Sequence, residues 1–143
     1  MPLLTLDVRQ SVDRTVAEVM AVAADLARLP EWALGFASGV ERVIRRAPEG
    51  EPGPGREVWL VDAPFGRVEV EFAVDVERGI LDHDVTMPDG TAVHNRLRVE
   101  SRGDGCELVF TVPRQPGMTD EQWRADAQAV ADDLRRLAAL CER

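Results

Sequence analysis

The stretch 119–143 restricts the possible folds more than any other part of the chain. Apolar side chains recur there at steps of three and four, which is the spacing of one face of an α-helix. They are Trp123, Ala127, Val130, Leu134, Leu137 and Cys141. The charged residues between them are expected to face water, and these are Arg124, Asp126, Asp132, Asp133, Arg135, Arg136 and Glu142. Thr119 and Gln122 form a capping box that marks the start of the helix. A helix of this length, roughly 34 Å, needs a broad apolar surface to cover its stripe.

The stretch 68–77 carries the clearest strand signal. Val68, Val70, Phe72, Val74 and Val76 alternate with residues that are mostly acidic, which is typical of a strand with one buried and one solvated face. Weaker alternation, bounded by turn residues, predicts further strands at 4–9, 40–45, 57–62, 80–87, 92–101 and 106–113. Short helices are predicted at 15–25 and 31–36, with Leu29-Pro30 breaking the first. A loop rich in proline and glycine is predicted at 47–55.

These elements follow the order β-α-α-β-β-β-β-β-β-α. Consecutive strands joined by short turns favour antiparallel neighbours, and a sheet with one apolar face needs a cover. The final helix is the element long enough to provide that cover. We therefore expect a single α+β domain over 1–143, in which a curved antiparallel sheet of about seven strands wraps around the C-terminal helix.

Composition excludes several classes of function. The net charge of −9 argues against nucleic-acid and anionic-membrane partners. All 17 basic residues are arginine, so lysine chemistry is absent, and tyrosine is absent too. No apolar run is long enough to span a membrane and no signal peptide is visible, so a cytoplasmic protein is expected. Cys106 and Cys141 are expected to be reduced thiols rather than a redox pair. No cofactor is predicted, and a homodimer is left open.

Three segments of the chain carry a family resemblance. They are VDRTVAEVMAVAADLARLPEWA (12–33), GILDHDVTMPDG (79–90) and GDGCELVFTVPRQPGMTDEQWRADAQAVADDL (103–134). Together they resemble the START-like or Bet v 1-like superfamily (SRPBCC), which comprises the polyketide cyclase/dehydrase and lipid transport proteins. The resemblance implies a helix-grip fold with a hydrophobic cavity between the sheet and the C-terminal helix. Members of the superfamily bind lipids, sterols, polyketides or hormones, and a minority catalyse cyclisation, dehydration or hydrolysis.

In such a fold the inward-facing strand positions, the short second helix and the helix stripe are expected to contact a ligand. The predicted contact residues are Trp32, Phe36, Trp59, Val70, Phe72, Val74, Leu81, His83, Val85, Asn95, Trp123, Ala127 and Val130. The pattern does not decide which face of strands 57–62 and 92–101 is turned inward. Concave sites with mostly apolar walls and few polar groups are typical of small-molecule binding.

His83 is the sharpest single candidate, because its alternation with Leu81 and Val85 places it on an apolar face. An imidazole there can serve as an acid or a base, although a hydrogen-bonded wall histidine is the simpler interpretation. Asp82 and Asp84 point to the opposite face of the strand and cannot orient it. Two histidines and their acidic neighbours match no zinc-ligand spacing, so no metal site is predicted.

Arg96 and Arg98 share one face of their strand. The simpler interpretation places them in water together with Glu100, and the alternative is a clamp for a ligand carboxylate or phosphate. The function predicted from the sequence is binding or carriage of a small hydrophobic ligand. The alternatives are a cyclase or dehydratase that uses His83, and an interaction or co-chaperone module with a filled cavity.

Overall fold

The computed structural model describes residues 4–43 and 56–143. Their elements follow the predicted order along the chain. The strands are β1 (Thr5–Val12), β2 (Gly39–Arg42), β3 (Arg56–Ala63), β4 (Gly66–Asp75), β5 (Ile80–Thr86), β6 (Ala92–Arg102) and β7 (Gly105–Pro113). The helices are α1 (Val16–Ala23), the 3-10 helix η1 (Leu26–Arg28), α2 (Leu29–Trp32) and α3 (Asp120–Cys141). The loop predicted at 47–55 and the end of the strand predicted at 40–45 lie outside the described residues.

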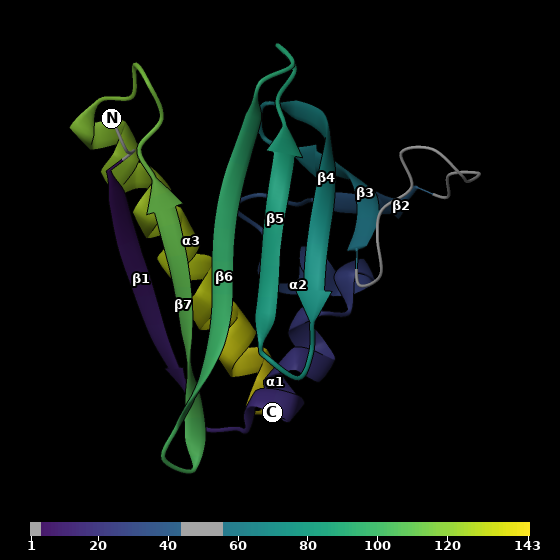
Figure 1. The fold of residues 1–143 in the computed structure, drawn as a ribbon, viewed down its shortest axis with the longest axis vertical. Helices are drawn as coiled ribbons and strands as arrows, with labels where there is room; N and C mark the ends of the chain where they lie inside the picture. The colour runs from purple at the N-terminus through teal and green to yellow at the C-terminus, as the bar shows by residue number, and fades with distance from the viewer. Residues whose placement is uncertain (1–3, 44–55) are drawn as a thin grey trace.

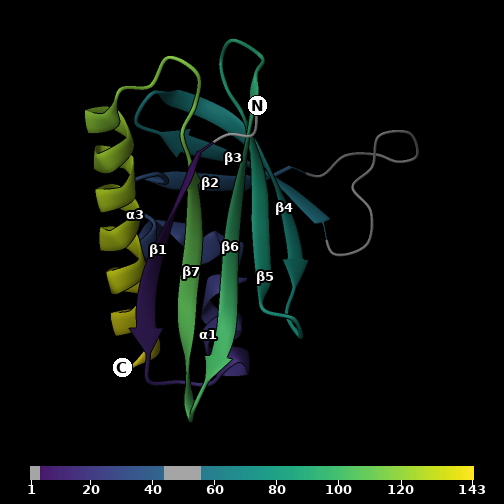
Figure 2. The ribbon, with the colours of Figure 1, turned by 60° about the vertical axis from the view of Figure 1, so that its left-hand side comes forward.

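The strands form one antiparallel sheet of seven in the order β1-β7-β6-β5-β4-β3-β2. The first strand therefore pairs with the last one, and the chain between them forms the rest of the sheet in sequence. The sheet curves, and α3 runs behind it on the side of β1 and β7 (Figures 1 and 2). Helices α1 and α2 lie near the C-terminal end of α3 (Figure 1). This is the helix-grip architecture predicted from the sequence.

Both main helices begin where local side-chain chemistry dictates. The Thr119 hydroxyl accepts a hydrogen bond from the Gln122 N–H at 3.1 Å, and the Gln122 side chain accepts one from the Thr119 N–H at 2.8 Å. Thr15 and Glu18 form the same reciprocal pair at the start of α1. Each capping box satisfies N–H groups that have no partner within the helix, so the predicted start of α3 is confirmed.

The connection between α1 and α2 differs from the prediction. Helix α1 already ends at Ala23, and Pro30 lies in the first turn of α2 rather than acting as a break. Proline is tolerated in a first turn because the N–H group that it lacks would have no helical partner there. The result is a short, bent segment that buries Leu29 and Trp32 against the core.

The strand register resolves the two faces that the sequence left open. Trp59 lies opposite Val70, which is fully buried, so β3 turns Trp59 and Val61 inward. In β6 the buried residues are Leu97 and Val99. Arg96 and Arg98 therefore lie on the outer face of the sheet, as the simpler of the two interpretations predicted.

The space between the sheet and α3 is filled at the end where α1 lies, and we call this part the closed half. Its core includes Val12, Met20, Leu108 and Leu137, each at most 3% exposed. Cys106 is buried and Cys141 half-buried in the same region, and both are free thiols. Side chains from α1, α3 and the strands β1 and β7 thus pack together at this end.

Candidate functional site

A cavity of about 440 Å³ lies between the sheet and the middle of α3. We call this part of the molecule the open half. The strands contribute Phe72, Leu81, His83, Val85, Val93, Asn95, Leu97, Phe110 and Val112 to the cavity wall. Helix α3 contributes Asp126, Ala129, Val130, Asp133 and Leu134, and the α2 region contributes Leu29, Trp32, Ala33, Gly35 and Phe36. The loops at the end of the sheet add Pro64, Phe65, Met87, Pro113, Gln115 and Met118.

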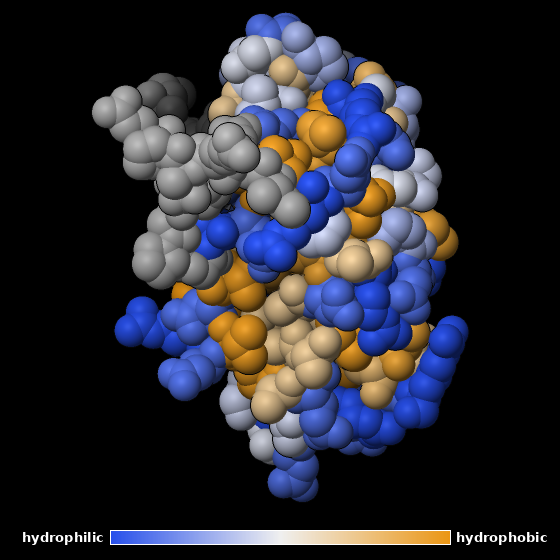
Figure 3. Space-filling view, turned by 90° about the vertical axis from the view of Figure 1, so that its right-hand side faces the viewer, coloured by the Kyte–Doolittle hydropathy of each residue, from blue (hydrophilic) through white to orange (hydrophobic). Residues whose placement is uncertain are grey.

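The exposed members of this lining mark the mouth of the cavity. They are Gly35, Pro64, Phe65 and Asp126. The mouth therefore lies between the segment after α2, the β3–β4 turn and α3. Phe65 remains 49% exposed, and Leu34, which precedes Gly35 in the chain, is 52% exposed. Apolar side chains also reach the surface among charged ones on the side of the molecule that carries β2 (Figure 3).

Most of the residues predicted to contact a ligand line this cavity. They are Trp32, Phe36, Phe72, Leu81, His83, Val85, Asn95 and Val130. They come from α2, the segment after it, three neighbouring strands and α3. The alternation pattern of β4 and β5 therefore identified the wall on the sheet side.

The other predicted contact residues lie outside the lining. Val70 is fully buried and Val74 half-buried in the core, and Trp59 is 8% exposed with its Nε1 3.4 Å from the Glu57 carboxylate. Ala127 is buried on α3. Trp123 donates a hydrogen bond from Nε1 to the Val112 carbonyl at 3.1 Å, and the Arg114 guanidinium lies over its ring. These side chains hold the elements together around the cavity.

The orientation of α3 explains this division and corrects one prediction. Because α3 packs mainly on β1 at the sheet edge, part of the apolar stripe is used there. The flank with Asp126, Ala129 and Asp133 is turned toward the cavity. The sequence pattern placed both aspartates in water, and for Asp133 this is wrong, since it is only 8% exposed.

Asp133 joins α3 to the segment after α2. Its carboxylate accepts a hydrogen bond from the Gly35 N–H at 3.0 Å and another from Arg136. The Arg136 guanidinium also donates to the Trp32 carbonyl at 3.1 Å. Desolvation by burial raises the pKa of Asp133, while the bonds from Gly35 and Arg136 act in the opposite direction. The ion pair between Asp133 and Arg136 therefore holds one wall of the cavity in place, and the two charges compensate each other.

Asp126 has no such partner. It makes no hydrogen bond or ion pair with the described residues, and desolvation raises the pKa of its carboxyl. Among the described residues that line the cavity, Asp126 and Asp133 are acidic and none is arginine. The charge of the wall is thus negative, and it is uncompensated at the mouth.

His83 lies in the cavity wall between two phenylalanines. Its ring centroid is 5.3 Å from that of Phe72 and 5.8 Å from that of Phe110. The Nδ1 atom lies 3.4 Å from the Leu81 carbonyl, a long and weak contact. Desolvation by burial lowers the pKa of His83 to about 4. The imidazole is therefore neutral at pH 7 and offers a nitrogen to a neighbouring polar group without adding charge.

Two further polar groups in the lining lack partners. Asn95 lies opposite His83 in the β5–β6 ladder, and its amide makes no side-chain hydrogen bond with the described residues. The Trp32 indole Nε1 is buried and also has no partner there. A buried donor without an acceptor costs about 1–3 kcal/mol. Uncharged polar groups of the wall thus have no side-chain partner among the described residues.

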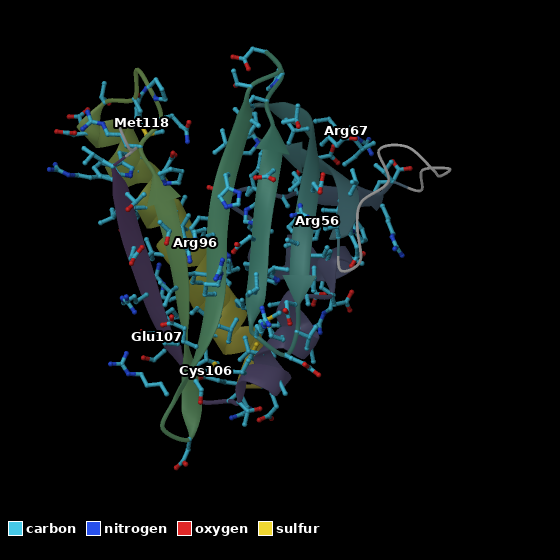
Figure 4. All side chains as sticks on the ribbon, viewed as in Figure 1. Arg56, Arg67, Arg96, Cys106, Glu107 and Met118 are labelled. Atoms are coloured by element: carbon cyan, nitrogen blue, oxygen red, sulfur yellow. The ribbon has the colours of Figure 1, made fainter. Side chains whose placement is uncertain are left out.

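The outer face of the sheet carries ion pairs instead. Arg98 binds Asp82, and Arg56, labelled in Figure 4, binds Glu71 at 2.8 Å. Glu107, only 7% exposed, bridges Arg9 and Arg102. The second histidine, His94, pairs with Asp84 on this face. Within residues 4–43 and 56–143, no group of His, Cys, Asp and Glu side chains is arranged to hold a metal ion.

A second hollow, of about 550 Å³, lies outside the grip. It is an open groove between the start of α1 and the β6–β7 turn, lined by residues such as Thr15, Glu77, Arg78, Glu100 and Asp104. Its walls mix polar and apolar side chains, and the groove is open to solvent. The mostly apolar cavity between the sheet and α3 is therefore the better candidate for a ligand site.

Comparison with known proteins agrees with this architecture. Residues 4–142 match the family described as polyketide cyclase / dehydrase and lipid transport. The chain belongs to this family. A search of the curated proteins finds no sequence match. No helix in the described part of the chain has the length and apolar character needed to cross a membrane.

Solved structures share the fold at low sequence identity. The Zhui aromatase/cyclase from Streptomyces sp. R1128 superimposes with a TM-score of 0.72 at 18% identity, covering 99% of this chain and 95% of that one. Ara h 8.0201 gives 0.71 at 19% identity and covers 98% of both chains. TTHA0849 from Thermus thermophilus gives 0.68 at 16% identity, covering 96% and 97%. These similarities establish the fold. They do not identify a ligand, which has to be inferred from the residues of the site.

Proposed function

We propose that this family member binds a small hydrophobic ligand in the cavity of the open half. The observation that carries the proposal is an unfilled, mostly apolar space of about 440 Å³, within the range of small-molecule sites. Removal of apolar ligand surface from water contributes about 25 cal/mol per Å². The unpartnered amide of Asn95 and the neutral imidazole of His83 orient a hydroxyl or carbonyl group on the ligand.

Catalysis by a cyclase- or dehydratase-type reaction is the second candidate, and the position of His83 in the cavity wall supports it. Its environment favours binding instead. With a pKa of about 4, roughly one imidazole in a thousand is protonated at pH 7, so it is a poor acid and a weak base. No carboxylate among the described residues bonds to the ring to orient it. A co-chaperone role was predicted to go with a filled cavity, and it is disfavoured because side chains leave this cavity unfilled.

Binding of a neutral fluorescent probe tests the proposal. N-phenyl-1-naphthylamine should bind with a blue shift and saturate at one molecule per chain. Ala129→Trp places an indole in the cavity, and we expect it to reduce probe binding at least tenfold. Leu34→Ala serves as the control, because Leu34 is exposed and lies outside the lining.

The proposal fails if the wild-type chain does not bind the probe, or if Ala129→Trp binds it as tightly as wild type. Native mass spectrometry of gently purified protein gives a second readout. A co-purified apolar mass that disappears in Ala129→Trp would support the proposal. For the catalytic alternative, turnover of a bound compound that is lost in His83→Gln while probe binding is retained would be decisive.

A further inference from the structure

The charge of the cavity wall restricts the kind of head group that a hydrophobic ligand can carry. An amphiphile can bind with its polar head either deep in the cavity or at the mouth. The deep wall offers the uncharged groups of His83 and Asn95. The mouth offers Asp126, a carboxylate without a partner among the described residues.

A carboxylate head is unfavourable in both orientations. Deep in the cavity, an anion would be removed from water without a counter-ion, because no arginine is among the described lining residues. At the mouth it would lie near the like charge of Asp126. A cationic head at the mouth would instead gain an opposite charge, and a neutral hydroxyl is compatible with either position.

The arginines around the open half do not change this balance. Arg136 is bound to Asp133 and to the Trp32 carbonyl. Arg114 is bound to the Met118 carbonyl and to Asp120. Arg96 lies on β6 but is exposed on the outer face of the sheet (Figure 4). Each is either paired or directed away from the lining.

We propose that the cavity selects its ligand by charge, preferring apolar amines and alcohols to carboxylates, with Asp126 setting the preference at the mouth. This inference rests on the proposed binding function and adds the chemical class of the ligand. It also separates this chain from a fatty-acid carrier, whose site would require a cation for the carboxylate.

Competition between three ligands with the same tail tests the inference. Decan-1-ol, decylamine and decanoate are each titrated against bound N-phenyl-1-naphthylamine at pH 7, the amine and the carboxylate below their critical micelle concentrations and the alcohol below its solubility limit. We expect decylamine and decanol to bind at least tenfold more tightly than decanoate. Asp126→Asn should lower the ratio of decanoate to decylamine dissociation constants at least threefold, and Asp126→Arg should lower it further.

Asp132→Asn is the matched control, since it removes one negative charge from the same helix outside the lining. It should leave the ratio at the wild-type value. If decanoate binds as tightly as decanol, selection by charge is wrong. It is also wrong if Asp126→Asn and Asp132→Asn change the ratio of the decanoate to decylamine dissociation constants equally. If the probe binds but none of the three ligands displaces it, the class of ligand is wrong while the cavity remains a binding site. If the probe itself does not bind, the proposed function fails as well.

Discussion

The closed and open halves of the grip are built from the same kinds of residue, yet one is filled and the other is hollow. In the closed half, α1 inserts Val19 and Met20 between the sheet and the end of α3, and both are fully buried. In the open half α2 lies along the wall without filling the space, and Ala129 and Val130 of α3 face a cavity. A single amphipathic helix can therefore support packing along one part of its length and ligand space along another.

The largest expected contrast comes from removing side chains. Leu137→Ala in the closed half should lower the free energy of unfolding by about 2–5 kcal/mol, because a fully buried side chain leaves a void. Val130→Ala in the open half should cost about 1 kcal/mol or less, because its side chain already borders a cavity. Urea unfolding of both variants measures the contrast. Equal losses would show that the two halves are packed alike.

Adding volume should give a smaller contrast. Ala138→Trp overfills the closed half, where Ala138 is 4% exposed, and should cost about 1–3 kcal/mol or more. Ala129→Trp enters free space and should leave the unfolding midpoint near that of wild type. Thermal unfolding followed by circular dichroism compares them. A strongly destabilised Ala129→Trp would mean that the open half has no room for an indole.

Asp133 lies where the two halves meet, and its removal tests how firmly the cavity wall is held. Asp133→Ala should cost about 1 kcal/mol, since it removes bonds to Gly35 and Arg136 while relieving a buried charge. Asp132→Ala, whose carboxylate pairs with Arg135 and Gln128 on the exposed side, should have little effect. Hydrogen exchange of the Gly35 amide should accelerate in the first variant alone.

The pH dependence of stability tests the apolar surroundings of His83. The folded chain protonates this ring near pH 4 rather than near its usual 6.5. Between these values the unfolded chain binds more protons, so the free energy of unfolding falls as the pH is lowered from 6.5 toward 4. His83→Gln should reduce the drop in Tm between pH 7 and pH 5 by about 4–7 °C.

His94→Gln provides the comparison for this measurement, because His94 is exposed and paired with Asp84 on the outer face. Its ring is exposed to solvent, whereas that of His83 lies between Phe72 and Phe110. An identical change in the acid-induced drop for both variants would contradict a desolvated His83 in the cavity wall.

The sequence predicted most of the fold, and local physics explains why. Alternation over 68–77 indicated the inner and outer faces of β4, and the capping residues Thr119 and Gln122 indicated the start of α3. Alternation over 68–77 and over 80–87 also predicted the inward faces that carry Phe72, Leu81, His83 and Val85, and these four side chains line the cavity. These signals are visible in sequence because the period of a strand or helix is set by its own backbone.

The rotation of α3 and the filling of each half could not be predicted from the sequence. Helical spacing shows that Ala127, Val130 and Asp133 lie near one another around the helix, but not which of them meets β1 and which meets the cavity. From the sequence, Asp133 is predicted to face solvent. Only the folded structure shows that its carboxylate accepts hydrogen bonds from Gly35 and Arg136. That Asp126 lies at the mouth without a partner among the described residues could be recognised only once its neighbours were placed.

Local patterns along the chain were enough to specify the elements, their order, the sheet that they form and its apolar face, because these depend on periodicity and on turns between adjacent residues. Only the tertiary structure shows which part of the interior is filled by side chains and which part is a cavity. That outcome depends on the distance between α3 and the sheet and on the side chains that α1 inserts, and such contacts join residues far apart in the chain.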